Sequence, residues 1–395
     1  MLPSLPLSGI RIIEFSHMVM GPTSGLILGD LGADVIKVEP MGAGDNTRRL
    51  AGSGAGFFIT FNRNKRSVGV DIKSKDGLAF IHRLIATADV VTENFRPGAL
   101  DALGLGAEAL TKSHPGLIYC SLKGFLTGPY EHRTALDEVV QMMGGLAYMT
   151  GPPGRPLRAG TSVNDIMGGM FAVIGILAAL QERHRTGRGQ VIKSGLFENN
   201  MLLVAQHMTQ FAVTGKAAAP MPERISAWAV YDVFETKDNE QVFLGVVSDS
   251  QWATFCEEYK LEALKADPRL QSNRDRVAER GWMIPELRRL LLEFTRAEII
   301  ATAERLGLPY APISRPEDLF EDPHLNHPGA MVEVTLADGR KAPVPALPLE
   351  WGGERFGLRL DIPKAGEHGV AIAREIGYSE PEIEAMIGAG ILQPG

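Results

Sequence analysis

The sequence has little cysteine and no excess of positive charge. Only two of its 395 residues are cysteines, Cys120 and Cys256, and no CxxC pair or Cys/His cluster is present. A disulfide framework and a metal site are therefore unsupported, and a reducing compartment, the cytoplasm, is expected. Forty Lys and Arg against 47 Asp and Glu give a net charge of -7, which argues against nucleic acid as a partner.

Signatures of several common chemistries are missing as well. The chain has no P-loop motif, no H-E-x-x-H, no EF-hand loop and no G-x-S-x-G, which disfavours phosphoryl transfer, zinc hydrolysis and common serine hydrolase chemistry. Its N-terminus lacks the basic and apolar regions of a secretory signal. The most apolar stretch, 166–180, contains three glycines and is too short for a span of ~20 residues. We therefore expect a buried helix there and no membrane partner.

What the first part of the chain does have is an alternation of strand and helix patterns. Strands that alternate with helices predict a parallel, doubly wound α/β sheet. From about Ala135 the pattern becomes helical, and it later includes a strand that runs into a long helix. Apolar strands are predicted at 10–15, 33–40, 67–73, 89–95 and 117–125.

The length and a change of composition predict two domains. The small and proline-rich stretch 215–223 is the best linker candidate. We expect a large domain in 1–200, with a linker helix to about 224, and a smaller α+β domain in 225–325. The smaller domain should contain a hairpin that turns at 237–239, and a second hairpin, in the final part 326–395, should turn at Asp338-Gly339.

The first strand–helix–strand unit has the outline of a dinucleotide site. Gly21, Gly25 and Gly29 follow the first strand, and Glu39 ends the second, where an acidic residue can bind a ribose hydroxyl. The spacing G-x-G-x-x-G is absent, however. A structural turn is therefore favoured, with a nicotinamide-dependent oxidoreductase kept as an alternative.

Asp165 stands alone at the start of an otherwise apolar helix rich in small residues. An aspartate in this place can be an N-cap that accepts hydrogen bonds from the first N–H groups. A carboxylate shielded from water by Met167, Met170 and Phe171 can instead be a nucleophile. One residue can do both, and the pattern alone leaves the choice open.

Many segments in the same order resemble the class III coenzyme A transferases, the group that includes formyl-CoA transferase. The resemblance covers most of the first 200 residues and recurs near the end of the chain. It is carried by LSGIRIIEFSHMVMGP, LGADVIKVEP with GAGDNTR, NRNKRSVGVDIK, ENFRPGALDALGLG, NDIMGG, LAALQERHRTGRGQ, FETKD, APISRPEDLFEDP and GEH.

The resemblance implies a fold, a partner and a nucleophile. It implies a Rossmann-like large domain built from both ends of the chain, so that 326–395 returns to it, and a homodimer whose chains are interlocked like rings. The substrate is a coenzyme A thioester, and no cofactor is bound permanently. Asp165 matches the family's nucleophile, which passes through an aspartyl anhydride and an aspartyl-CoA thioester.

The resemblance also implies positions for coenzyme A along the first domain. From their types alone, several of the matching residues are ordinary core or surface positions. The matching positions are Val19, Met20, Pro40, Val70, Asp71, Ile72, Lys73, Asn94, Phe95, Arg96, Leu136 and Asp137.

The related α-methylacyl-CoA racemases place a histidine before the acidic residue that Asp137 matches. Leu136 stands there in this chain and cannot carry a proton, so transfer is favoured over racemisation. Arg158 and Arg224 are candidates to bind the distal carboxylate of a dicarboxylic acid. We therefore expect transfer from succinyl-CoA to a C4–C5 dicarboxylate such as itaconate, mesaconate, citramalate, malate or glutarate.

Alternatives remain for the acceptor acid and for the functional class of the protein. The stretch 245–252 keeps only Gly245 and Gln251 of the glycine-rich loop that covers the intermediate in formyl-CoA transferase, which leaves a lid at this stretch in doubt. The segment leading into FETKD reads RISAWAVYDVF instead of the usual family sequence, so a bulkier acceptor acid than oxalate is expected. Ser248, Asp249 and Gln251 are candidates to shape the acceptor pocket. An aromatic or other bulky acid is the competing acceptor, and an acyl-CoA racemase or a non-catalytic CoA-binding protein are the other classes considered.

Overall fold

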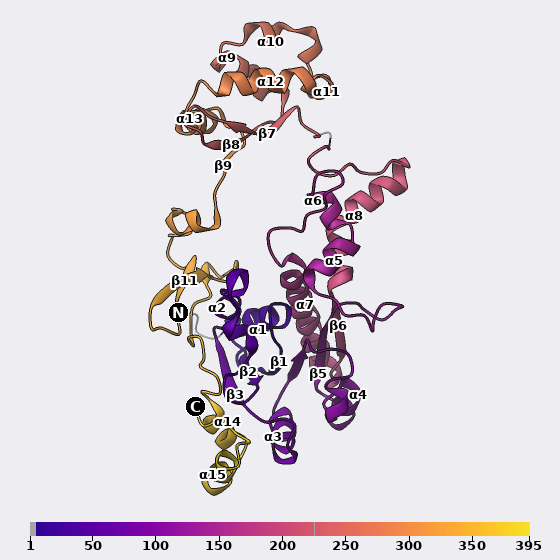
Figure 1. The fold of residues 1–395 in the computed structure, drawn as a ribbon, viewed down its shortest axis with the longest axis vertical. Coiled ribbons are helices and arrows are strands. Elements are labelled where there is room, and N and C mark those ends of the chain that lie inside the picture. The colour runs from indigo at the N-terminus through magenta and orange to yellow at the C-terminus, as the bar shows by residue number, and fades with distance from the viewer. Residues whose placement is uncertain (1–4, 225) are drawn as a thin grey trace. The chain divides into compact units, whose positions relative to one another are not determined.

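The computed structural model describes residues 5–224 and 226–395, which fall into two compact units (Figure 1). The large unit contains the chain up to Pro222 together with Asn326–Gly395. The small unit is Glu223–Leu325. The chain therefore leaves the large unit once and returns to it.

A six-stranded sheet forms the centre of the large unit, and all its strands are parallel, which confirms the predicted α/β class. The strand order is β3-β2-β1-β4-β5-β6, so the direction of progression reverses between β1 and β4. Ile13 of β1, for example, pairs with Ile36 on one side and Val91 on the other. The strands are β1 Arg11–Phe15, β2 Asp34–Glu39, β3 Lys65–Gly69, β4 Val90–Glu93, β5 Ile118–Lys123 and β6 Val191–Gly195.

Each face of this sheet is covered by helices because successive strand residues point to opposite sides. Ile12 belongs to the core beneath α1 (Met20–Asp30) and α7 (Val163–Thr186). Ile13 belongs to the opposite core, which includes residues of α3 (Lys75–Ile85), α14 (Gly369–Glu375) and α15 (Glu380–Gly388). Other elements of the large unit are α2 Phe57–Phe61, α4 Ala107–Ser113, α5 Asp137–Met143, α6 Leu146–Thr150, α8 Leu196–Thr214, β10 Met331–Thr335, β11 Lys341–Pro345, β12 Glu350–Trp351 and β13 Glu354–Arg355.

The small unit combines a three-stranded sheet, in the order β7-β8-β9, with helices around its own core. The predicted hairpin turning at 237–239 is confirmed, as is the one turning at Asp338-Gly339 between β10 and β11. Elements of the small unit are β7 Val230–Glu235, β8 Gln241–Val246, β9 Tyr310–Pro312, α9 Asp249–Glu258, α10 Glu262–Ala266, α11 Asn273–Ala278, α12 Arg280–Leu291 and α13 Arg296–Leu306.

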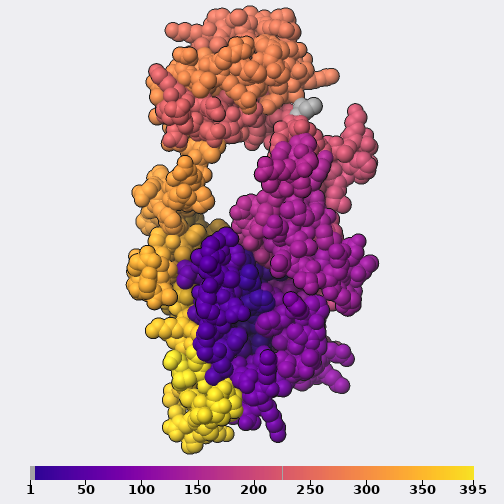
Figure 2. Space-filling view, in the orientation of Figure 1, coloured from indigo at the N-terminus to yellow at the C-terminus, as the bar shows by residue number. Residues whose placement is uncertain are grey.

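The third predicted strand, 67–73, is displaced. Strand β3 ends at Gly69, and Val70 forms an isolated antiparallel bridge with Leu392 instead. Residues after Val70 turn into α3, whose N-cap Ser74 accepts a hydrogen bond from the N–H of Gly77. Figure 2 shows the corresponding C-terminal segment, in yellow, lying against the N-terminal part of the large unit, in indigo.

Helix α7 is long and apolar enough to cross a membrane by length and composition alone. In the large unit, however, it packs against α1 and the strands β5 and β6, and Ala172, Val173 and Ile176 are part of the core. Met170, Ile174 and Leu177 on its other face are exposed, so the prediction of a buried helix holds for one face only. Length and composition therefore do not by themselves make α7 a membrane span.

Candidate active site

The carboxyl ends of four neighbouring strands carry most of the predicted coenzyme positions. Because β1, β2, β3 and β4 are parallel, the loops that follow them meet at one edge of the sheet. The strand order reverses between β1 and β4, and ligands of open α/β sheets bind at such a reversal. The predicted positions here are Val19 and Met20 after β1, Pro40 after β2, Val70, Asp71, Ile72 and Lys73 after β3, and Asn94, Phe95 and Arg96 after β4.

Asn94 ties the loop after β4 to the loop after β1. Its side-chain oxygen accepts a hydrogen bond from the N–H of His17 at 3.0 Å, and its Nδ2 donates to the His17 carbonyl at 2.8 Å. The His17 ring stacks on Phe95 with the centroids 5.5 Å apart. Burial lowers the pKa of His17, the nearby Asp45 carboxylate opposes this, and Lys37 adds to the lowering.

The loop after β1 leads into α1, whose first turn packs against α7. The Met20 side chain covers Gly168, and the Met20 carbonyl oxygen lies 2.8 Å from the place where a Cβ on Gly169 would stand. Since Gly168 and Gly169 lie one helical turn after Asp165, the predicted coenzyme loop abuts the start of α7.

Asp165 is the third residue of α7, so its interpretation as the N-cap is wrong. The N-cap position is Ser162, whose side chain makes no capping hydrogen bond. The cap comes instead from another helix: Oδ1 of Asp137, the first residue of α5, accepts from the N–H of Asn164 at 2.8 Å and of Asp165 at 3.3 Å. Asp165 is therefore left free of the capping role.

Asp137 is buried and held in place by further contacts. Nε2 of Gln141, one turn along α5, donates to its Oδ2 at 2.5 Å, and Oε1 of Gln141 accepts from the N–H of Ala159 at 2.8 Å. The sequence prediction of Asp137 as a coenzyme contact did not foresee this capping function. Gln141, spaced four residues from Asp137, was missed, although that spacing places two polar side chains on one helix face.

The environment of Asp165 disfavours its charge. Burial raises the pKa of Asp165, the Asp137 carboxylate raises it further and Arg158 opposes them, so that the pKa is about 7. Asp165 is half-buried, and the charge of Arg158 offsets only part of these effects. Once ionised, a carboxylate with a raised pKa is a stronger nucleophile than an ordinary one. Asp165 thus has the properties of a functional carboxylate.

Arg158 lies beside this pair of carboxylates and is only loosely engaged. Its Nη2 is 3.4 Å from Oδ2 of Asp137 and its Nη1 is 3.5 Å from Oε2 of Glu138. The side chain keeps 37% of its surface exposed. These distances are longer than those of a tight charged hydrogen bond, so the guanidinium retains donors for a further carboxylate.

The other predicted acceptor residues belong to the small unit. Arg224 is exposed. Ser248 is the N-cap of α9 and accepts from the N–H of Gln251, while Asp249 forms an ion pair with the buried Arg276. Oε1 of Gln251 accepts from the N–H of Val247, and its Nε2 donates to the Gly307 carbonyl. Each contact of Ser248, Asp249 and Gln251 stabilises the small unit, and their part in an acceptor pocket stays a prediction.

Glu39 is not available for a ribose. Its buried carboxylate accepts from Arg48 at 2.6 and 2.8 Å, from Oγ of Ser67 at 2.6 Å and from the N–H of Asp45 at 2.8 Å. Burial alone would raise the pKa of Glu39, but the bonds and charge of Arg48 hold it below its ordinary value. In the first strand–helix–strand unit, which has the outline of a dinucleotide site, Glu39 therefore has a structural role.

A group of buried charges lies under the same loops and was missed by the sequence analysis. Nζ of Lys65 is 2.9 Å from Glu14, and Nζ of Lys37 is 3.0 Å from Asp45 and donates to the Ser16 carbonyl at 2.6 Å. Lys37 thereby joins the loop after β1 to the loop after β2. The signal was available, because Glu14 and Lys37 are charged residues inside otherwise apolar strands.

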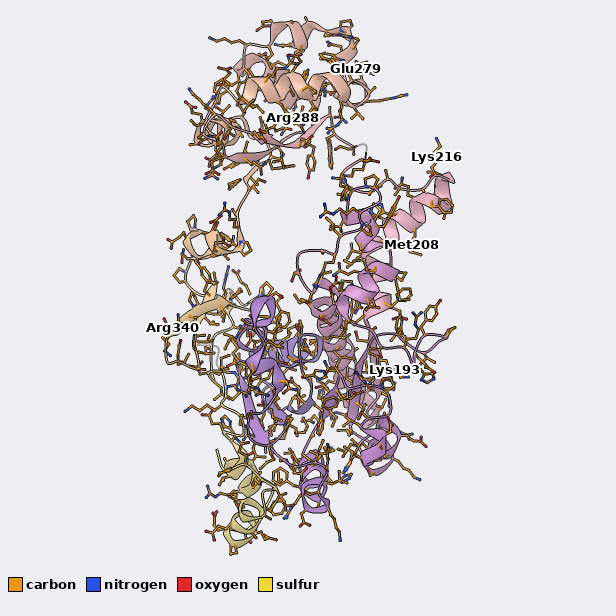
Figure 3. All side chains as sticks on the ribbon, in the orientation of Figure 1. Lys193, Met208, Lys216, Glu279, Arg288 and Arg340 are labelled. Carbon is orange, nitrogen blue, oxygen red and sulfur yellow. The ribbon has the colours of Figure 1, made fainter. Side chains whose placement is uncertain are left out.

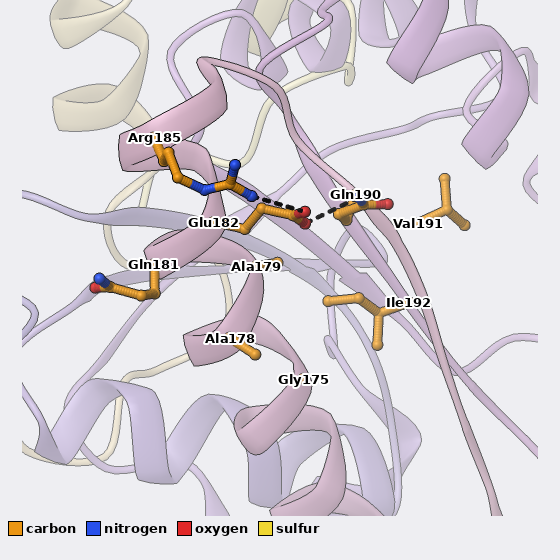
Figure 4. Close-up of a pocket in the computed structure, with 9 residues that line it drawn as sticks. All are labelled: Gly175, Ala178, Ala179, Gln181, Glu182, Arg185, Gln190, Val191 and Ile192. Atoms are coloured by element: carbon orange, nitrogen blue, oxygen red, sulfur yellow. Dashed lines mark hydrogen bonds and ion pairs between the residues drawn. The ribbon is translucent and has the colours of Figure 1, made fainter.

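Two cavities of the large unit differ in their relation to these residues. One of about 350 Å³ is lined by Arg96, Glu93 and Lys123 among others and borders the loop after β4. Another, of about 630 Å³, lies between the later turns of α7 and β6, where Glu182 contacts Arg185 and Gln190 (Figure 4). At 1.5 Å per residue, Glu182 is roughly 25 Å along α7 from Asp165. This second cavity is therefore remote from Asp165.

Exposure separates the remaining predicted positions. Pro40, Lys73, Arg96 and Leu136 are exposed, whereas Val19, Met20 and Val70 are buried.

Within residues 5–224 and 226–395, no group of three His, Cys, Asp or Glu side chains could hold a metal ion.

Comparison with known proteins gives the family. The model of CoA-transferase family III matches residues 7–369. The chain belongs to this family. The resemblance to the class III coenzyme A transferases is confirmed, and the protein is a CoA-transferase that uses a CoA thioester as substrate. The alternatives of a nicotinamide-dependent oxidoreductase and of a non-catalytic CoA-binding protein are set aside.

Named relatives of this CoA-transferase match it over most of their length. The succinyl-CoA:glutarate CoA-transferase of Mus musculus is 33% identical over 98% of this chain and 90% of its own. The succinyl-CoA–D-citramalate CoA-transferase of Chloroflexus aurantiacus is 32% identical over 82% of each. A crystal structure of a CaiB/BaiF family protein from Brucella suis superposes with a TM-score of 0.85 and 34% identity, covering 94% of this chain and all of that one.

Proposed function

We propose that this CoA-transferase moves coenzyme A from succinyl-CoA to a C4–C5 dicarboxylate, with Asp165 as the nucleophile. The observation that carries the proposal is the half-buried Asp165 at the start of α7, with its pKa raised to about 7, beside the cap Asp137 and the loosely paired Arg158. The names of the relatives from Mus musculus and Chloroflexus aurantiacus support the substrate class, since both join succinyl-CoA to a dicarboxylate.

In the first half of the reaction, coenzyme A moves from succinate to Asp165. A carboxylate oxygen of Asp165 attacks the thioester carbonyl of succinyl-CoA, the C–S bond breaks, and CoA leaves as the thiolate. The product is a mixed anhydride of succinate and Asp165. The thiolate then attacks the Asp165 carbonyl carbon and releases succinate, which leaves an aspartyl-CoA thioester.

The second half repeats these steps with the acceptor. The acceptor carboxylate attacks the aspartyl thioester and displaces the CoA thiolate, which forms a new anhydride. The thiolate attacks the acceptor carbonyl of this anhydride, so the new acyl-CoA and the free Asp165 carboxylate are produced. Each step exchanges one activated acyl group for another, so the energies are nearly balanced, and water must be kept away from both intermediates.

Arg158 is the residue of the large unit best placed to select a dicarboxylate. The carboxylate that does not react needs a cation, and a guanidinium can bind it through two parallel hydrogen bonds. Because its contacts to Asp137 and Glu138 are long, Arg158 can form these two hydrogen bonds with the substrate carboxylate. We propose itaconate, mesaconate, citramalate, malate and glutarate as acceptors.

The coenzyme itself is proposed to lie along the loops after β1 to β4. This places the pantetheine end at Val19 and Met20, beside the start of α7, and the nucleotide end along Pro40 and the turn Val70–Lys73. Lys73 and Arg96 are exposed cations available to phosphate groups, although the net charge of the chain is -7.

A homodimer is part of the proposal. Met170, Ile174 and Leu177 form an exposed apolar stripe on α7. Leu202, Met208 and Phe211 are exposed on α8, along which Met208 is marked in Figure 3. Exposed apolar residues gathered on neighbouring helices are typical of an interface, and a second copy of the chain is the occupant that we propose.

The test is an acceptor panel with succinyl-CoA. The purified protein is incubated with succinyl-CoA and each C4–C5 dicarboxylate, and the new acyl-CoA is quantified by liquid chromatography. Transfer to at least one of these acids is expected, and Asp165→Ala should lose it by ~10⁴-fold or more while still binding CoA.

Three results would contradict parts of the proposal. Transfer to an aromatic acid but to no dicarboxylate would overturn the substrate class. Retained transfer by Asp165→Ala would remove Asp165 as nucleophile. Exchange of the α-hydrogen of an acyl-CoA for deuterium without an acceptor acid would favour a racemase.

A further inference from the structure

The side chain of Gln393 fills a gap beneath two loops of the large unit. A Cβ added to Gly69, the last residue of β3, would lie 2.7 Å from Oε1 of Gln393. One added to Gly366 would lie 2.7 Å from Cδ of the same side chain. The half-buried amide therefore lies between two positions that only glycine can occupy without a shift.

The amide of Gln393 forms hydrogen bonds with the loop after β2. Oε1 accepts from the N–H of Gly42 at 2.9 Å, and Nε2 donates to the Gly42 carbonyl at 3.3 Å and to the Ala365 carbonyl at 2.7 Å. The backbone N–H of Gln393 donates to the Gly69 carbonyl at 2.9 Å. One residue thus joins the loop after β2 to the end of β3.

The same segment holds the turn after β3. Val70 forms its bridge with Leu392, and the N–H of Asp71 donates to the carbonyl of Ile391 at 2.9 Å. Since β3 is the edge strand of the sheet, this segment supplies the neighbour that the end of β3 otherwise lacks.

The loop after β2 needs such a tether because of its own composition. Gly42 and Gly44 both adopt left-handed backbone conformations, with φ of 77° and 67°. Glycine loses more conformational entropy on ordering than any other residue, so this loop is costly to order without fixed contacts.

We propose that Gln393 is a positioning residue for the nucleotide half of coenzyme A, an inference that rests on the proposed function. Its amide fixes the loop that carries Pro40, and its segment fixes the turn Val70–Lys73. A preordered pair of loops binds the adenosine phosphate end more tightly than loops that must be ordered on binding.

The test compares two thioesters in one variant. Gln393→Met keeps the length of the side chain and removes its hydrogen bonds. The three side-chain hydrogen bonds that order the loop are lost, so we expect the KM for succinyl-CoA to rise about tenfold, the equivalent of about one net hydrogen bond, with kcat changed less than twofold. With succinyl-pantetheine, which lacks the nucleotide, KM and kcat should equal those of the unchanged protein.

Two further variants make the result specific. Gln271→Met is a matched control, because the Gln271 amide also donates to backbone carbonyls, those of Lys265 and Asp267, but in the small unit. It should leave both KM values unchanged. Gln393→Glu keeps the acceptor for the N–H of Gly42 and should fall between the unchanged protein and Gln393→Met, and it replaces Gln393→Met should that variant not fold.

Each contrary outcome has a separate meaning. An unchanged KM for succinyl-CoA, or an equal loss with both thioesters, would overturn the positioning role. Calorimetry with CoA alone tests the inference without turnover, and equal affinities of the variant and the unchanged protein would also overturn it. Absence of transfer by the unchanged protein would contradict the proposed function, while the calorimetric comparison still decides the role of Gln393.

Discussion

At the scale of single residues, the surroundings of Asp165 destabilise the folded state whenever its carboxylate is ionised. Burial and the neighbouring Asp137 carboxylate raise its pKa to about 7 from an ordinary value of 3.8. The folded chain therefore holds a proton on Asp165 more tightly than the unfolded chain does. The stability associated with that proton is present at low pH and is lost as the pH rises through about 7.

Replacement of Asp165 by Asn should therefore stabilise the protein, and more so at high pH. The difference between 3.8 and about 7 sets an upper bound of about 4 kcal/mol for the gain at pH 8. At pH 4 the two proteins should have nearly equal free energies of unfolding. Thermal unfolding at both pH values measures this, and a gain that does not depend on pH would contradict the raised pKa.

The same pKa predicts the pH dependence of catalysis and the effect of Asp137. The nucleophile must be ionised, so kcat/KM for succinyl-CoA should rise with pH and level off above about 7.

Asp137→Asn keeps an oxygen that can cap α7 but removes the negative charge, so the rising limb should move to lower pH. An unmoved limb would mean that Asp137 does not act on the charge of Asp165.

At the scale of elements, the strands were predictable and the start of α7 was not. Apolar runs such as Ile10–Phe15 determine a buried parallel strand locally. The cap of α7, in contrast, comes from Asp137, a residue of another helix, and no local pattern records such a contact. The shift of β3 has the same origin, because Val70 pairs with Leu392 from the far end of the chain.

The close contact between α1 and α7 gives a prediction at this scale. A methyl group on Gly169 would approach Cβ of Thr23 to 2.7 Å and the Met20 carbonyl to 2.8 Å. Gly169→Ala should therefore push the two helices apart, cost about 1–3 kcal/mol of stability and reduce transfer, because both sides of the contact border the site.

A matched control separates this contact from helix propensity. Gly281, the second residue of α12, has no atom from outside its own helix within 4 Å of an added Cβ, so Gly281→Ala should be neutral or gain up to about 0.5 kcal/mol. Chemical denaturation of both variants measures the effects. Equal stability changes at the two positions would show that the contact between α1 and α7 is not tight.

At the scale of the whole molecule, the exposed apolar stripe on α7 predicts that the working form contains two chains. Ile174 is 57% exposed in the centre of the stripe. Analytical ultracentrifugation should show a dimer at micromolar concentration. Since interlocked chains pair as they fold and cannot separate afterwards, Ile174→Asp should lower the fraction of folded protein that is recovered as dimer. Leu292, 44% exposed in the small unit, supplies the control Leu292→Asp, which should remain dimeric. A monomeric unchanged protein would refute the proposed dimer.

The family and the α/β class could be predicted from the sequence because ordered motifs and strand periodicity record them. The functional use of single side chains was predictable only in part. Ser248 and Gln251, predicted for an acceptor pocket, make contacts that stabilise the small unit, whereas Gln393 had no local signal for its position beneath Gly42 and Gly69. Contacts between distant segments depend on packing, which a single sequence does not display.

The most direct test of the central claim is to trap the CoA thioester of Asp165. The protein is incubated with succinyl-CoA, reduced with borohydride and digested, and the peptide that contains Asp165 is examined by mass spectrometry. An aspartyl-CoA thioester is reduced to homoserine, so homoserine is expected at position 165 only when succinyl-CoA is present, and Asp165→Ala should give no reduced residue. Reduction at a different residue, or rapid turnover with Asp165 unmodified, would contradict its role as the nucleophile.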